Sequence, residues 1–140
     1  MATDLVGPEG TLPLPWLAAP LAQALAAQRG HALLLRCAPG AGALALALVL
    51  AQSRLCESPV EAAGGLACGR CASCRLVQSH SHPDLFVLLP EIDRRASGWL
   101  LAGDKPNEEA KTKPSRQIRI DDVRGLIDWV TKTSARGRGK

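Results

Sequence analysis

Aromatic side chains are scarce in this sequence of 140 residues, which has three tryptophans, one phenylalanine and no tyrosine. Alanine and leucine must therefore form most of the interior, and this favours helices packed on a short apolar sheet. A hydrophobic run long enough to cross a bilayer is also lacking, since the run at residues 43–51 is too short. Residues 1–9 lack the positively charged start of a secretion signal. We therefore expect a cytoplasmic protein without membrane contact.

An excess of one charge sign is also missing from most of the chain. Residues 1–104 hold seven Lys/Arg against eight Asp/Glu, whereas residues 105–140 hold ten against five. This basic C-terminal stretch is typical of a solvated face, and it could also contact nucleic acid or an acidic partner. It is poor in aromatic side chains that could stack on bases, which argues against binding of single strands.

Catalytic constellations are absent as well. The run Ser79-His80-Ser81-His82 pairs serine with histidine, but neither serine lies on a Gly-x-Ser-x-Gly elbow. Asp84 is too close in sequence to orient either histidine. The sequence therefore predicts no catalytic residues.

Cysteines, in contrast, are grouped tightly in one region. Three of them form two overlapping Cys-x2-Cys turns, and a fourth precedes these by twelve positions: Cys56, Cys68, Cys71 and Cys74. Cys-x2-Cys lets both sulfurs of a turn face one ion, and Zn²⁺ takes four thiolates tetrahedrally. In a reducing compartment such a cluster favours metal over disulfides. We expect a closed, structural zinc site in a module of residues 56–74.

Other interpretations of the cluster are a redox pair or free thiols. His80 and His82 could each replace a thiol, but four cysteines already complete the shell, and His82 is expected to hydrogen-bond locally before Pro83. Cys37 lies too far away in sequence and is expected to be a small buried residue.

Hydrophobic periodicity and Gly/Pro positions predict an α/β chain. Helices are predicted over residues 15–29, 43–55, 71–79 and 120–133, and buried strands over residues 31–36 and 85–89. In the last helix Val123, Ile127 and Val130 should share one face. Residues 90–117 show no periodicity and are predicted to form a long mobile loop, anchored only by Trp99-Leu100-Leu101.

The turn between the first predicted strand and its helix resembles a phosphate-binding loop that has lost its working residues. An active loop reads Gly-x-x-x-x-Gly-Lys-Ser/Thr, in which the lysine reaches phosphate and the hydroxyl holds Mg²⁺. Here the glycine positions would be filled by Cys37 and Gly42, and the lysine and hydroxyl positions by Ala43 and Leu44. Without those groups neither tight ATP binding nor hydrolysis is expected. From the pattern alone, Pro39-Gly40-Ala41-Gly42 could equally be a plain tight turn.

Several short segments, taken in chain order, match one known family. They are Pro15-Trp16-Leu17, Gly30-His31-Ala32-Leu33-Leu34, residues 39–42, Leu55-Cys56, residues 68–74, His82-Pro83-Asp84-Leu85, Ile120-Asp121-Asp122-Val123-Arg124 and Ala135-Arg136-Gly137. In these segments, which are spread over nearly the whole chain, the sequence resembles the delta prime subunits of the bacterial DNA polymerase III clamp loader.

The resemblance implies an incomplete AAA+ P-loop-type nucleotide-binding core with an inserted four-cysteine zinc module. Residues 1–140 would be the N-terminal part of an AAA+ domain, with the family's C-terminal domains absent. The chain would be a non-catalytic stator in the cytoplasmic, nucleoid-associated replisome, with structural Zn²⁺ and no ATP. Its implied partners are gamma/tau-type and delta-type subunits and, through the complex, the sliding clamp and primed DNA.

The sequence also departs from the family pattern. The family supplies an arginine to a neighbouring ATPase from a Ser-Arg-Cys motif, which this sequence lacks. In AAA+ sheets, strands encoded later lie between the two predicted here, so their apolar edges would be unpaired. Two alternatives stay open: a small zinc-binding module that contacts nucleic acid through its basic stretch, and an active P-loop NTPase.

Overall fold

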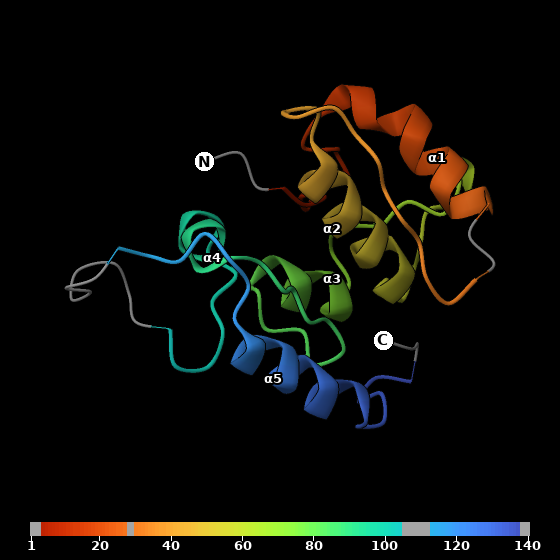
Figure 1. The fold of residues 1–140 in the computed structure, drawn as a ribbon. Coiled ribbons are helices and arrows are strands. Elements are labelled where there is room, and N and C mark those ends of the chain that lie inside the picture. The colour runs from red at the N-terminus through yellow and green to blue at the C-terminus, as the bar shows by residue number, and fades with distance from the viewer. Residues whose placement is uncertain (1–3, 28–29, 105–112, 138–140) are drawn as a thin grey trace. The chain divides into compact units, whose positions relative to one another are not determined.

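The computed structural model describes residues 4–27, 30–104 and 113–137. It divides into two compact units, residues 1–82 and residues 83–140, which are described separately. Within the described residues all regular secondary structure is helical, and β-type pairing is limited to one isolated bridge between Val60 and Leu66 (Figure 1). No helix among these residues has both the length and the apolar character needed to cross a membrane.

The first unit is a stack of short helices. Its elements are the 3-10 turn η1 (Pro15–Leu17), α1 (Ala18–Ala27), α2 (Ala43–Leu55), the 3-10 turn η2 (Glu61–Ala63) and α3 (Ala72–Gln78). Helix α2 packs against α1 and α3. Pro20 is tolerated in α1 because the N–H groups of a first turn have no intrahelical partner. The Ala/Leu composition of α2 gives it a high intrinsic helix propensity. The helices predicted for this unit are thus confirmed, within a residue or two at the described ends.

Small and aliphatic side chains fill the interior of this unit, as the scarcity of aromatics requires. The buried cluster joins the N-terminal segment, three helices and the cysteine loop: Val6, Leu17, Leu21, Ala45, Leu46, Val49, Leu50, Cys56, Ala67, Cys68 and Cys74. Three of the four grouped cysteines therefore belong to the hydrophobic core itself. Substitution of any of these three cysteines would therefore change the hydrophobic core as well as the candidate site.

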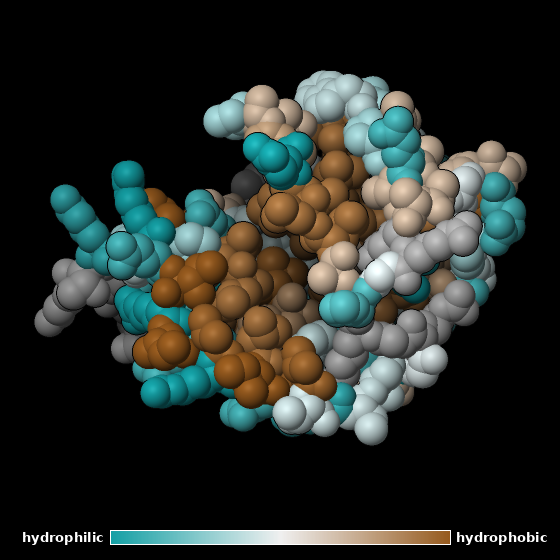
Figure 2. Space-filling view, turned by 45° about the vertical axis from the view of Figure 1, so that its right-hand side comes forward, coloured by the Kyte–Doolittle hydropathy of each residue, from teal (hydrophilic) through white to brown (hydrophobic). Residues whose placement is uncertain are grey.

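The two predicted strands were wrong. Residues 31–36 and 85–89 have no regular secondary structure. A strand is stable only when its N–H and C=O groups pair with a neighbour, and no described segment supplies that pairing. In the first segment Leu33 and Leu34 are 45% and 83% exposed. Both side chains therefore reach the surface. Figure 2 shows brown, hydrophobic areas on the face that it draws.

The second unit contains α4 (Glu91–Ser97) and α5 (Ile120–Val130). Helix α4 lies where an irregular loop was predicted, so that part of the prediction was wrong. Acidic residues in its first turn and basic residues in its last turn complement the helix dipole. Gly98, at a φ of 80°, ends the helix in the left-handed conformation that glycine adopts without strain. Part of the predicted loop, residues 105–112, lies outside the described residues.

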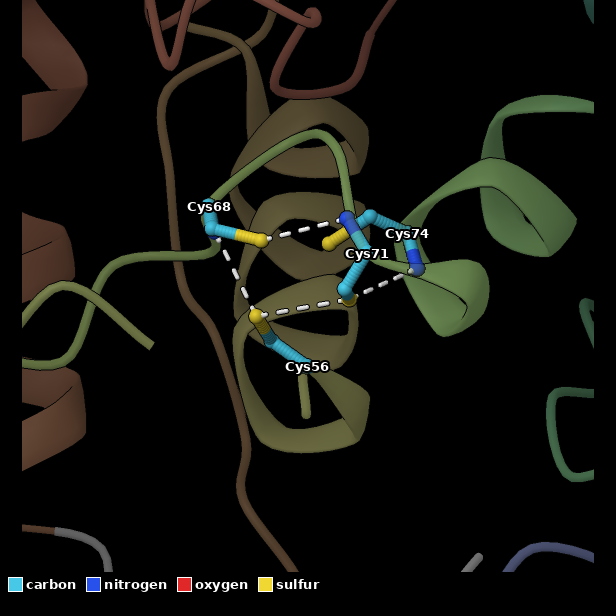
Figure 3. A group of neighbouring side chains, drawn as sticks. All are labelled: Cys56, Cys68, Cys71 and Cys74. Carbon is cyan, nitrogen blue, oxygen red and sulfur yellow. Dashed lines mark hydrogen bonds between the residues drawn. The ribbon is translucent and has the colours of Figure 1, made fainter. Parts of the chain in front are cut away.

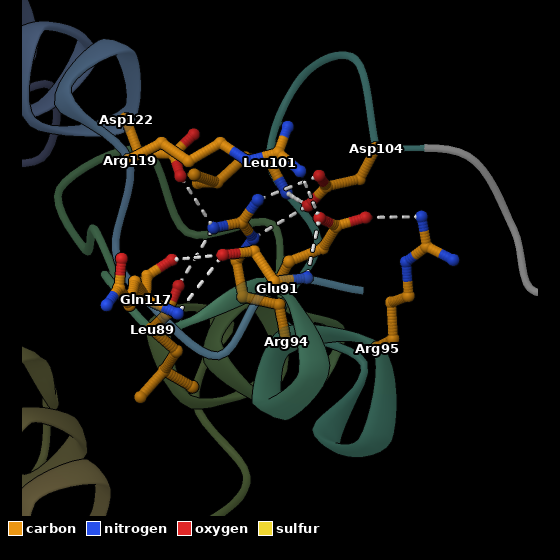
Figure 4. A network of polar contacts seen from close by, with 10 residues as sticks. Leu89, Glu91, Arg94, Arg95, Leu101, Asp104, Gln117, Arg119 and Asp122 are labelled. Carbon is orange, nitrogen blue, oxygen red and sulfur yellow. Dashed lines mark hydrogen bonds and ion pairs between the residues drawn. The ribbon is translucent and has the colours of Figure 1, made fainter. Parts of the chain in front are cut away.

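A network of charged side chains surrounds α4 (Figure 4). Arg94 is buried, and its guanidinium donates two hydrogen bonds of 2.8 Å to Asp104 and one of 3.0 Å to Asp122. It donates another, of 2.8 Å, to the Leu89 carbonyl oxygen. Glu91 forms ion pairs with Arg95 and Arg119. Residues 90–104 are therefore held by several polar contacts in addition to the predicted anchor Trp99, which is buried.

Two residues before α4 hold the last turn of α5 and the chain that follows it. Asp84 is 2% exposed and accepts hydrogen bonds from the Ser134 hydroxyl and from the Ala135 and Arg136 backbone N–H groups, at 2.9, 2.7 and 2.8 Å. The Trp129 indole donates to the Pro83 carbonyl oxygen at 2.8 Å. Helix α5 begins at Ile120 as predicted and ends at Val130, three residues before the predicted end.

The apolar face of α5, in contrast, stays largely open. Ile127 and Val130 are 57% and 60% exposed, and Ile120, at the start of the helix, is 65% exposed. Such exposure is unusual. Full burial of a large aliphatic side chain contributes about 1.5–3 kcal/mol of transfer free energy, and these side chains gain only part of it.

Candidate metal centre

The structure brings the four grouped cysteines together (Figure 3). Their sulfur atoms all lie within 4.8 Å of one another. Cys56 is the C-cap residue directly after α2, and Cys71 is the N-cap of α3. Cys68 begins the turn that leads to Cys71, and Cys74 lies in the first turn of α3. All four, together with Cys37, are free thiols.

Local backbone structure explains why the sulfurs converge. After Cys56 the chain makes a short excursion that closes on itself through the bridge between Val60 and Leu66. The Ala67 N–H then donates to the Ser53 hydroxyl oxygen at 3.0 Å, which returns the chain to the last turn of α2. The following Cys-x2-Cys turn leads directly into α3. Two helix ends and one turn thus present their thiols to a common point.

The four sulfurs are grouped closely enough to surround one metal ion. With Zn–S bonds of about 2.3 Å, tetrahedral geometry places the sulfurs about 3.8 Å apart. The Sγ atoms of Cys56 and Cys71 are 3.8 Å apart. Backbone N–H groups also point at the sulfurs, because Cys68 N–H donates to the Cys56 sulfur, Cys71 N–H to the Cys68 sulfur and Cys74 N–H to the Cys71 sulfur, at 3.3, 3.3 and 3.4 Å. Such donors stabilise negatively charged thiolates, which is the form that binds metal.

The thiols differ in how readily they ionise. Burial raises the pKa of the Cys56 thiol, and it raises that of Cys74 strongly. Burial acts in the same direction on Cys68, but the backbone N–H groups of Arg70 and Cys71 outweigh it and lower the Cys68 pKa to about 7. A cation at the centre would favour the ionised form of all four. With four thiolates as ligands the shell would be closed, which is the pattern of structural rather than catalytic zinc.

Neither histidine near the cluster is a member of it. His82 is buried, and its Nε2 atom lies 2.9 Å from the Ser73 hydroxyl oxygen. That hydroxyl donates to the Leu55 carbonyl oxygen at 2.6 Å, so its single proton is used and the His82 Nε2–H must be the donor. The expected hydrogen bond of His82 is therefore present, but its partner lies on α3. Through Ser73, His82 is linked to the residue directly before Cys56 and to the residue directly before Cys74.

Buried polar side chains around the cysteines were not anticipated from the sequence. They are Gln52 and Ser53 on α2 and Ser73 on α3, together with the half-buried Gln78 of α3, and each bonds to backbone groups of the N-terminal segment, of the cysteine loop or of Leu55 at the end of α2. A signal was present at Gln52 and Ser53, since two polar residues interrupt the apolar run of α2. A polar residue on a buried helix face must find a hydrogen-bond partner.

The loop before α2 has the backbone shape of a tight glycine turn. Gly40 and Gly42 have φ values of 79° and 92°, and Gly42 is the N-cap of α2. The Trp16 indole donates to the Ala41 carbonyl oxygen at 3.2 Å. A Cβ atom at Gly42 would lie 2.7 Å from the Leu14 Cδ1 atom. Apolar groups from the η1 region thus lie directly against the loop.

The other residues of this loop lie as follows. Cys37 and Pro39 are exposed, so the prediction that Cys37 is buried was wrong. The reason is that the preceding segment does not enter a sheet and leaves its end at the surface. Ala43 is exposed and Leu44 is half-buried at the start of α2.

Fold and site together define the class of protein: a small, largely helical protein in which a glycine turn precedes α2 and a candidate four-cysteine metal centre follows it.

A family model described as "DNA polymerase III, delta subunit" matches residues 17–140. Among curated relatives, the DNA polymerase III subunit delta' of Pseudomonas aeruginosa is 39% identical over 114 residues, which cover 81% of this chain and 27% of the relative. The protein of the same name from Escherichia coli K12 is 34% identical over 121 residues, which cover 81% of the chain and 35% of the relative.

A third relative, the subunit delta' of Yersinia pestis, is 41% identical over 88 residues, which cover 60% of the chain and 25% of the relative. No solved structure matches the chain. The chain belongs to the family of DNA polymerase III delta prime subunits. It spans between a quarter and about a third of the length of these curated relatives.

Proposed function

We propose that this chain acts as a non-catalytic stator in the clamp loader of DNA polymerase III and helps to load the sliding clamp onto primed DNA in the cytoplasm. Membership of the delta prime family carries this proposal. Its partners would be gamma/tau-type and delta-type subunits, and it would reach the clamp and the primed DNA through the assembled complex.

The loop before α2 supports a role without ATP hydrolysis. Ala43 and Leu44 occupy the positions at which a working phosphate loop has its lysine and its Mg²⁺-binding hydroxyl. Each charge-assisted contact of that kind contributes about 1.5–3 kcal/mol, and this loop offers neither. Atoms of Leu14 and Trp16 lie within 4 Å of the position that a Cβ atom would take at Gly42, so these side chains pack closely on the turn. We infer a degenerate phosphate loop that serves as a structural turn.

The four cysteines would hold a structural Zn²⁺ ion. This proposal rests on two observations: their sulfurs lie within 4.8 Å of one another, and three backbone N–H groups donate to them. An ion there would join the end of α2, the start of α3 and the loop between them. Such a link compensates for the limited core that a unit of about 80 residues can build.

The exposed apolar surface supports a role inside a larger assembly. Ile120, Ile127 and Val130 are each more than half exposed on α5. Monomeric proteins seldom leave such groups of aliphatic side chains in water, whereas subunits of complexes do so at their interfaces.

Reconstitution with purified loader subunits tests the proposal. The chain is mixed with gamma/tau-type and delta-type subunits and passed over a sizing column, and ATP hydrolysis is measured for the chain alone and for the mixture. We expect co-elution with the subunits and no hydrolysis by the chain alone. Hydrolysis by the chain alone would favour an active NTPase. Salt-sensitive DNA binding by the chain alone, without co-elution, would favour a nucleic-acid-binding module.

A further inference from the structure

The N-terminal strap, defined as Leu5, Val6 and Gly7, packs into the first unit although it has no regular secondary structure. Leu5 is 4% and Val6 0% exposed. Val6 belongs to the same hydrophobic cluster as Cys56, Cys68 and Cys74. An N-terminal segment usually frays unless specific contacts hold it, so the contacts of this strap need an explanation.

One glutamine side chain pairs with the strap as a neighbouring strand would. The Val6 N–H donates to the Gln52 Oε1 atom at 2.8 Å, and the Gln52 Nε2 atom donates to the Val6 carbonyl oxygen at 3.0 Å. Gln52 itself is fully buried on α2. Both backbone groups of Val6 are thereby satisfied without a β-ladder.

A second glutamine connects the strap to the turn of the candidate metal centre. The Gln78 Nε2 atom donates to the Val6 carbonyl oxygen at 2.8 Å and to the Gly69 carbonyl oxygen at 2.7 Å. Gly69 lies in the turn between Cys68 and Cys71. The strap and the turn also touch directly, because a Cβ atom placed on Gly69 would lie 1.8 Å from the Gly7 carbonyl oxygen.

These contacts make the position of the strap dependent on the conformation of the cysteine turn. We propose that the strap is a latch that seats when the four cysteines hold a metal ion and detaches when the ion is lost. The inference rests on the proposed metal centre. Without the ion the turn between Cys68 and Cys71 is no longer fixed at its two sulfurs, and it then cannot hold the Gly69 carbonyl in line with Gln78.

Coupling of this kind is reciprocal. If the bound ion raises the equilibrium constant for seating of the strap by some factor, then the seated strap must raise the affinity of the site for the ion by the same factor. Loosening the strap should therefore increase the rate at which the protein gives up its metal. This consequence provides a readout that does not depend on any activity of the clamp loader.

Hydrogen exchange of the Val6 backbone amide in the full chain tests the latch. The exchange rate is measured in the zinc-loaded protein and after zinc is removed with a chelator. We expect exchange at Val6 to accelerate at least about fivefold on chelation, while amides in the middle of α2 remain protected. An unchanged rate at Val6 in a protein that does lose its zinc would overturn the latch. A protein that takes up no zinc would overturn the metal centre itself.

Two glycine variants separate the contact from general backbone strain. Gly69→Ala places a methyl group against the Gly7 carbonyl oxygen in a turn with a φ of 73°. Gly64→Ala is the matched control, since its φ is 67° and no atom lies within 4 Å of its added Cβ. We expect Gly69→Ala to release zinc to a competing chelator at least about fivefold faster than Gly64→Ala. Equal release rates would contradict the latch.

Gln78→Leu provides a second route that leaves the backbone of the cysteine turn unstrained. It removes both donors that join Val6 to Gly69. The expected result is faster zinc release together with faster exchange at Val6. Normal exchange at Val6 in this variant would show that the strap is held independently of the turn.

Discussion

Replacing Arg94 by methionine tests whether the buried network around this residue stabilises the second unit. Arg94 is the centre of a buried network, with its side chain 3% exposed and that of its partner Asp104 11% exposed. Four hydrogen bonds leave its guanidinium, two to Asp104 and one each to Asp122 and Leu89. Methionine keeps the unbranched stem but supplies no donor, so the Asp104 carboxylate loses its buried counter-charge.

The magnitude follows from that isolated carboxylate. Removing one partner of a buried ion pair costs about 3–5 kcal/mol, because the remaining charge stays desolvated. Asp104 keeps one donor, the Leu101 N–H at 2.8 Å, and this favours the lower half of the range. Since small domains are stable by only about 5–15 kcal/mol, the second unit should be severely weakened.

Arg124→Met is the matched control for this substitution. Arg124 and its partner Asp121 are 70% and 82% exposed, and exposed pairs contribute little. Urea denaturation and hydrogen exchange of α4 and α5 measure both variants. We expect loss of protection in α4 and α5 for Arg94→Met and an unchanged profile for Arg124→Met. Equal, small effects of the two substitutions would refute the assignment of Arg94 as the organising residue.

Three further predictions concern the first unit and the pH response. Cys74→Ser should abolish stoichiometric zinc binding, measured by metal analysis, whereas Cys37→Ser should leave it unchanged; loss in both would contradict the ligand set. Leu46→Ala should lower the free energy of unfolding by about 2–5 kcal/mol, and Leu34→Ala, at an exposed position, should not; similar melting temperatures would refute the described core. Hydrogen bonding to Arg94 lowers the pKa of Asp104 below its unfolded value. The stabilisation of the fold by the Asp104 carboxylate is therefore complete above about pH 4, and it disappears as the pH falls through the folded pKa. Urea denaturation between pH 6 and pH 2 should show this loss, and Asp104→Asn should flatten it.

Helices with strong local signals could be predicted from the sequence. The Ala/Leu run of α2 begins after a glycine turn, and α5 has two acidic residues in its first turn, so composition and end signals agreed there. The cysteine spacing likewise predicted that four thiols would meet at one point. These features depend on residues close together in the sequence.

Features that depend on distant partners could not be predicted. The Leu33-Leu34 segment has the composition of a buried strand, but a strand needs a neighbour, and no described segment supplies one. Helix α4 has only seven residues, too few for a periodic pattern, and it is held by Arg94 through contacts with Asp104 and Asp122. From the sequence alone, a buried arginine cannot be distinguished from an arginine in an exposed loop, because its partners are not known. The same applies to Gln52 and Gln78, whose partner is the N-terminal strap.

We propose that Cys56, Cys68, Cys71 and Cys74 hold a structural metal ion that organises the first unit of this delta prime family member. Native mass spectrometry of the chain, purified without added zinc, tests this proposal when it is combined with thermal melting before and after chelation. We expect a mass that corresponds to one zinc ion per chain and a large drop in melting temperature when the ion is removed. A metal-free mass with a melting curve that the chelator does not alter would contradict it.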